Sequence, residues 1–92
     1  LRASIVEKGE AKKNKQKEVY IDLGAPDGVY KGLQFDVFLV KTIAGKEAKT
    51  MIGRLKIEEV EGDEISLCKV IKGADKIKTA LDEDQTLLIT SR

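Results

Sequence analysis

Hydrophobic and polar residues alternate along most of this chain. Val19, Ile21 and Leu23 fall on one side of an extended backbone, because successive side chains of a strand point to opposite faces. Tyr20 and Asp22 lie between them and fall on the other side. This pattern predicts a strand with one buried face.

The same period of two predicts six strands in all. They are expected over residues 1–7, 18–23, 35–40, 51–60, 64–72 and 86–90. In the third strand, Phe35, Val37 and Leu39 share one face, whereas Phe38 and Val40 make the opposite face apolar as well. A strand that is apolar on both faces is usually central or covered by another element.

Turn and loop signals separate these strands. Residues 24–28 (GAPDG) and residues 61–63 (EGD) predict tight turns, because proline presets φ and glycine permits positive φ. Residues 43–50 are expected to form a hairpin connection. Residues 8–17 are too polar to bury, and we expect a mobile loop there.

Two of the predicted strands depart from strict alternation. Gly53 lies inside a strand, where glycine is typical of a bulge or a sharp bend at a barrel corner. Val70 and Ile71 are adjacent apolar residues, and this slip in period indicates either a bulge or a second covered face.

Residues 73–82 break the β pattern. Ile77, Ala80 and Leu81 stand at positions i, i+3 and i+4, which predicts one or two turns of helix over about residues 74–82. Asp75 is expected to cap the first turn.

Short strands joined by turns, with one helix near the end, predict an all-β fold. We expect a small six-stranded antiparallel barrel of the SH3 or OB type, with one short helix before the last strand. Residues 1–92 form a single domain in this interpretation. Because the chain does not begin with Met, we expect a fragment of a longer or processed protein.

The composition argues against catalysis and against a metal or cofactor site. The chain has no His, and its single cysteine, Cys68, excludes an intrachain disulfide and a cysteine-rich zinc site. Serines 4, 66 and 91 have no His partner, and the acids at 58–64 and 82–84 read as solvated turns rather than calcium loops. No apolar run approaches the roughly 20 residues of a membrane span, so no membrane insertion is expected.

A stretch of this sequence resembles a known family. The runs VYIDLG (19–24), DGV (27–29), KGLQFDVF (31–38) and IGRLKI (52–57) look like the C-terminal domain of flagellar assembly protein T. Similar domains accompany CsgG-like proteins of curli assembly. The resemblance covers roughly residues 18–71. Where the family usually has a Gly-Asp pair before the last strand, this chain has residues 81–85 (LDEDQ).

The resemblance implies a small β barrel of the bacterial periplasm or cell envelope that mediates protein contacts and has no enzymatic activity. It carries over no functional residue, because the matching positions are structural glycines and core apolar residues.

A nucleic-acid interface is the alternative. Lysines cluster in the loop at residues 8–17, where Lys12, Lys13, Lys15 and Lys17 with the nearby Tyr20 would form an oligonucleotide-binding surface. However, 17 basic against 16 acidic residues leave a net charge of +1, and a dedicated nucleic-acid binder would carry a basic excess. A solvated loop is the simpler interpretation.

Outward apolar residues are the stronger clue to function. They form a candidate interaction surface of Tyr20, Tyr30, Phe38 and Val40. Contiguous exposed apolar surface usually marks a contact with another domain or chain. The sequence leaves two ways to cover it: the helix predicted at residues 74–82, or a protein partner or neighbouring domain. The oligomeric state stays open.

Overall fold

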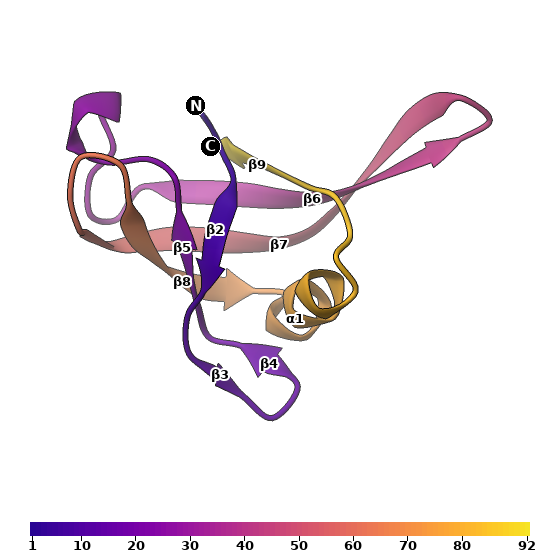
Figure 1. Ribbon diagram of the computed structural model, residues 1–92, viewed down its shortest axis with the longest axis horizontal. Coiled ribbons are helices and arrows are strands. Elements are labelled where there is room, and N and C mark those ends of the chain that lie inside the picture. The colour runs from indigo at the N-terminus through magenta and orange to yellow at the C-terminus, as the bar shows by residue number, and fades with distance from the viewer.

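The computed structural model describes residues 1–92 and forms a nearly closed antiparallel barrel (Figure 1). Its main sheet has the strand order β1-β9-β6-β7-β8-β5-β2. These strands are β1 (Arg2–Ala3), β2 (Ile5–Lys8), β5 (Glu18–Ile21), β6 (Gln34–Ile43), β7 (Lys46–Val60), β8 (Ser66–Lys72) and β9 (Leu87–Ser91). One helix, α1 (Ala74–Asp82), precedes the last strand. The predicted all-β barrel with a short helix is confirmed.

The N-terminal segment closes the barrel by pairing with two different strands. Its first part, β1, pairs with β9, and its second part, β2, pairs with β5. The break falls at Ser4, whose N–H donates to Asp22 Oδ1 at 2.7 Å, while the Asp22 N–H donates to the Ser4 carbonyl at 3.1 Å. One predicted strand therefore becomes two, and the six predicted strands become seven.

Alternation sorts the side chains as expected. The inward residues of the sheet are fully buried and form one core: Val19, Ile21, Phe35, Val37, Leu55, Ile57, Cys68 and Ile89. Burying each of the larger ones contributes on the order of 1.5–3 kcal/mol. The hydrophobic term therefore selects the same face of every strand that the sequence pattern predicts.

The bulge expected at Gly53 is confirmed. The pairing of β6 with β7 shifts between Gly53 and Met51, which leaves Ile52 as an extra residue. A Cβ atom at Gly53 would clash with the carbonyl oxygen of Lys72 and would lie 2.7 Å from Ile77 Cδ1. The glycine therefore allows α1 to pack directly on the bend of β7.

The slip in period in the fifth predicted strand is also a bulge. Arg54 pairs with Lys72 and Leu55 pairs with Val70, so Ile71 is the extra residue of β8. Its side chain is 42% exposed, which agrees with a position on the outside of the barrel.

The helix α1 covers one end of the barrel with Ile77 and Ala80, both buried. It begins after Gly73, whose φ of 72° only glycine adopts readily. The cap predicted at Asp75 is wrong. Asp75 lies inside the helix, where its carbonyl oxygen accepts the Thr79 hydroxyl at 3.1 Å, and the capping residue Gly73 has no side chain to bond.

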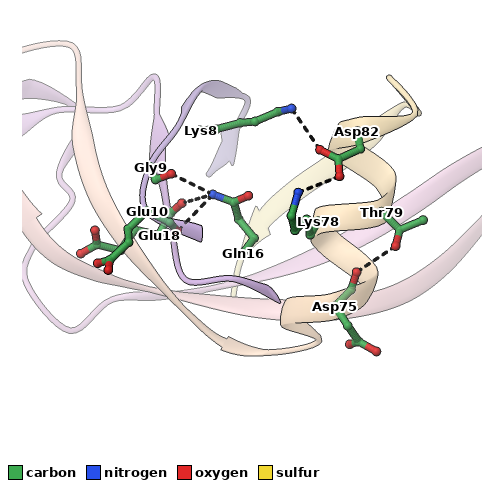
Figure 2. A network of polar contacts seen from close by, with 9 residues as sticks. All are labelled: Lys8, Gly9, Glu10, Gln16, Glu18, Asp75, Lys78, Thr79 and Asp82. Carbon is green, nitrogen blue, oxygen red and sulfur yellow. Dashed lines mark hydrogen bonds and ion pairs between the residues drawn. The ribbon is translucent and has the colours of Figure 1, made fainter. Parts of the chain in front are cut away.

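The expectation that residues 8–17 form a loop too polar to bury is wrong as well. This segment forms a two-stranded hairpin of β3 (Ala11–Lys12) and β4 (Lys15–Gln16). Gln16 is buried, and its amide nitrogen lies 2.7 Å from the carbonyl oxygen of Glu18, with those of Gly9 and Glu10 at 3.2 and 3.3 Å (Figure 2). One buried polar side chain thus fixes the hairpin to the barrel.

Residues 43–50 are not a simple connection. The strands β6 and β7 continue beyond the barrel to a two-residue turn at Ala44 and Gly45, both with positive φ, as a tight hairpin requires. We call residues 41–50 the arm. It projects from one end of the barrel (Figure 1), and all its residues except Ala48 are exposed. A turn was predicted here, but the strands on both sides are longer than the hydrophobic pattern indicates.

Candidate functional site

Four apolar side chains gather on the outside of the barrel where β9, β6 and β7 lie side by side. Phe38 of β6 stands directly opposite Met51 of β7 and Leu88 of β9. Val40 lies two residues further along β6 on the same face, because side chains alternate along a strand. We call Phe38, Val40, Met51 and Leu88 the outer apolar face.

The helix does not cover this face. Leu39 and Lys41 alternate with Phe38 and Val40 and therefore lie on the opposite side of β6. There they line a groove of about 310 Å³ together with residues of α1, among them Ala80. Of the two coverings that the sequence left open, the one by the helix is wrong.

The outer apolar face is partly shielded by its own side chains. Met51 is 38% exposed, and Phe38, Val40 and Leu88 are half-buried. None of the four packs against the buried core cluster. These residues therefore cover one another across three strands without completing the core.

A polar rim bounds the outer apolar face at one end. Asp36 accepts from Arg54 Nε at 3.2 Å, and Arg92 Nε lies 3.6 Å from the same carboxylate oxygen. An apolar centre with a charged rim is the common anatomy of a protein interface.

The structure does not bring Tyr20 and Tyr30 to Phe38 and Val40. Tyr20 pairs with Leu67, which pairs with Glu59 of β7, and Glu59 is eight residues from Met51 along that strand. Eight residues of strand span about 26 Å. Tyr30 is 61% exposed and lies in the loop that leads into β6. The candidate surface is thus divided between separate places.

Met51 and Leu88 are the members that the sequence pattern did not single out. Leu88 falls on the outward side by alternation from its buried neighbour Ile89, so a signal was present for that residue. Met51 is two positions from the buried Gly53, and only the bulge at Ile52 turns its side chain outward. Strand pairing puts them beside Phe38. Met51 lies 13 residues from Phe38, across the β6–β7 hairpin, whereas Leu88 lies 50 residues from it, and pairing over that separation leaves no local mark in the sequence.

The lysines of the alternative nucleic-acid interface lie on the β3–β4 hairpin. Lys12 and Lys15 form the hairpin's cross-strand pair, Lys13 occupies its turn, and Lys17 follows β4; all four side chains are exposed. Tyr20 lies on the neighbouring strand β5 and is half-buried.

These lysines share their surroundings with acids. Lys12 and Lys17 line one pocket together with Glu10, Glu18 and Glu58. A hydrogen bond between the side chains of Glu18 and Glu58 raises the pKa of Glu18; partial burial and the negative charges of Glu58 and Glu10 raise it further. The carboxylates therefore offset the positive potential that would attract a phosphate backbone.

Cys68 is buried in the core and unpaired. Desolvation raises the pKa of its thiol to about 12, so almost none of it is thiolate near neutral pH. Its expected role as a small hydrophobic residue is consistent with this position. No three His, Cys, Asp or Glu side chains come close enough together to hold a metal ion. The absence of enzymatic activity stays a prediction.

No helix of the structure has both the length and the apolar character that crossing a bilayer requires. Comparison with models of known protein families and with curated proteins found no match to this chain. The resemblance of residues 18–71 to the C-terminal domain of flagellar assembly protein T therefore stays a prediction.

Proposed function

We propose that this chain is a non-enzymatic β-barrel module that binds a protein partner through its outer apolar face. The observation that carries the proposal is the position of Phe38, Val40, Met51 and Leu88, which lie together outside the core and are not covered by α1. Apolar side chains in such a place usually mark a contact surface.

The bacterial cell envelope is the proposed setting. This part of the proposal is supported only by the resemblance of residues 18–71 to the domain of flagellar assembly protein T. In that setting, the module would hold its parent protein in a larger assembly by protein contacts.

Photo-cross-linking in the source cell, followed by titration, tests the proposal. A photoreactive amino acid at position 38 should capture a protein that the same group at position 30 does not. That protein, once purified, is titrated into the isotopically labelled chain while the backbone amide resonances are followed. The resonances of β6, β7 and β9 around the outer apolar face should shift, and those near Tyr20 and Tyr30 should not.

Matched variants make the titration quantitative. Phe38→Ser should weaken binding by about tenfold or more, a loss of roughly 1.4 kcal/mol, as expected when a central apolar contact is truncated. Met51→Ser tests the same face at a more exposed position, and Tyr30→Ser is the control for loss of an exposed aromatic side chain. Unchanged affinity in both face variants, with wild-type thermal stability, would contradict the proposal.

Oligonucleotide binding by the basic hairpin remains the second candidate. Lys56 and Lys69 stand directly across from each other on β7 and β8, and Lys69 lines the same pocket as Lys12 and Lys17 of the hairpin. Such a like-charged pair is unfavourable in a sheet without a compensating anion. A salt-dependent fluorescence titration with single-stranded DNA and RNA tests this candidate. Micromolar binding that weakens when Lys12, Lys15 and Lys17 become alanine would favour it over the outer apolar face.

A further inference from the structure

The arm has a free strand edge. On the barrel, β7 is flanked by β6 and β8, but its pairing with β8 begins only at Arg54. Residues 46–51 therefore have a neighbouring strand on one side only. None of the backbone hydrogen bonds outside the helices and strands involves them, and no side chain bonds to them.

This free edge has a defined end. The backbone of Gly73 lies so close to Ile52 that a Cβ atom at Gly73 would clash with the Ile52 carbonyl oxygen. The edge is therefore closed from Ile52 onward by the segment that begins α1, and it is open from Lys46 to Met51. An unpaired row of N–H and C=O groups is a template for another strand.

We propose that the free edge of β7 pairs with the same edge of a second copy of this chain. A closed dimer of identical chains has a two-fold axis. If this axis is perpendicular to the sheet, the β7 strands of the two copies run antiparallel to each other. One residue then lies opposite its own copy, and every other pairing in the interface follows from that choice. This inference concerns a different surface from the outer apolar face and does not depend on the proposed function.

Charge selects the register of this pairing. An axis at Lys46, Glu47 or Lys49 would place two identical charges directly opposite each other, which is unfavourable. An axis at Thr50 or Met51 would place a residue of the second copy opposite Ile52, where Gly73 already lies. An axis at Ala48 avoids both problems.

The Ala48 register is also electrostatically complementary. It places Glu47 opposite Lys49 of the second copy, and the two-fold axis repeats this pair, so each dimer has two ion pairs. Glu47 and Lys49 stand across from Thr42 and Val40 of their own chain, on the same side of the sheet as the outer apolar face. The two copies would then present their outer apolar faces on one side of a continuous sheet.

The shape of the molecule permits this arrangement. The arm projects from one end of the barrel (Figure 1), so antiparallel arms carry the two barrels at opposite ends. Residues 46–50 of one copy pair with residues 50–46 of the other. The turn of each arm then ends beside Ile52 of the other copy, where Gly73 of that copy closes the edge of β7. Five residue pairs are fewer than a stable interface of about 1,000 Å² needs, so we expect a dissociation constant of roughly 0.1–1 mM.

Charge reversal tests the register as well as the association. Sedimentation equilibrium between roughly 0.02 and 2 mM should show a monomer–dimer equilibrium for the chain. Glu47→Lys places two pairs of lysines opposite each other, and Lys49→Glu places two pairs of glutamates opposite each other. Each single variant should weaken self-association by about tenfold or more.

The decisive measurement is the mixture of the two single variants. In the Ala48 register, a lysine at position 47 faces a glutamate at position 49 of the other variant, while Lys49 faces Glu47. The equimolar mixture should therefore dimerise like the wild type, and so should the double variant Glu47→Lys/Lys49→Glu. Lys41→Glu is the control, because it makes the same charge change as Lys49→Glu on the β6 strand of the arm.

Three results would overturn the inference. They are a monomer at every concentration, a dimer that the single reversals leave intact, and a mixture that fails to associate while the wild type does. Phe38→Ser should dimerise normally, so loss of partner binding in that variant would be distinguishable from loss of self-association. A chain that stays monomeric yet binds an extended partner peptide along β7 would likewise contradict self-pairing.

Discussion

Glu18 and Glu58 are two acids that folding brings together. They lie 40 positions apart in the sequence and meet because β5 and β7 flank the same strand, β8. Their contact raises the pKa of Glu18 above the ordinary value of a glutamate side chain. A raised pKa in the folded state means that folding favours the protonated carboxyl. The resulting stabilisation is present below the unfolded pKa and is lost as the pH rises through the folded pKa.

Glu58→Gln should therefore increase the free energy of unfolding at pH 7. The amide removes one of two repelling charges and donates to the Glu18 carboxylate. The gain should shrink as the pH falls, because protonation of Glu18 removes its repulsion with Glu58 in the wild type. Urea unfolding at several pH values measures the difference. Glu59→Gln is the control, since it removes the same charge from the adjacent position, and an equal gain in both variants would contradict this account.

At the scale of the elements, α1 packs on the barrel through an apolar side whose largest fully buried side chain is Ile77. Ile77 is fully buried and packs on Gly53, where β7 bends. An exposed ion pair adds a second link, from Lys8 Nζ of β2 to Asp82 Oδ1 at 3.2 Å, and Lys78 holds the other oxygen of Asp82 at 2.7 Å (Figure 2). These two cations lower the pKa of Asp82. Exposed pairs contribute little to stability, so apolar packing dominates.

Ile77→Ala should reduce the free energy of unfolding by about 2–5 kcal/mol, because it leaves a cavity under the helix. Chemical denaturation followed by circular dichroism measures this loss. Lys76→Ala, at an exposed position of the same helix, should change stability by no more than about 0.5 kcal/mol. If both variants had similar stability, the helix would not be anchored through Ile77.

The whole molecule consists of a packed barrel and an unsupported arm. Its longest dimension is 39 Å, and the arm extends along that axis (Figure 1). The strand β6 loses its second neighbour after Leu39, where its pairing with β9 ends, although the Val40 N–H still donates to the Thr86 carbonyl at 3.0 Å. Beyond this point, no residue of the arm is buried. Segments without buried contacts open locally at low free energy.

Amide hydrogen exchange should separate these two parts. Backbone amides of residues 41–50 should exchange through local opening, whereas those of Val19, Val37 and Cys68 should exchange only with global unfolding. The measurement belongs in the Glu47→Lys variant or at low protein concentration, where self-pairing does not protect the arm. Equal protection of arm and core amides would show that the arm is stabilised by contacts not seen in the fold.

The inward face of each strand and the span of α1 follow from local pattern. The period of two requires Phe35 and Val37 to share a face, and the i, i+3, i+4 spacing of Ile77, Ala80 and Leu81 requires a helix, whatever the strand order. The bulge at Gly53 was predictable for the same reason. Gln16 was not, because its burial depends on three carbonyl oxygens that β5 and the hairpin supply after folding.

Strand neighbours were decided by tertiary structure. The pairing β9-β6-β7 puts Leu88 and Met51 beside Phe38 and leaves the two tyrosines elsewhere. The start of β8 pairing at Arg54, together with the approach of Gly73 to Ile52, sets where the free edge of the arm begins. Alternation specifies which way a side chain points along its own strand, but hydrogen bonds between distant segments specify what lies next to it.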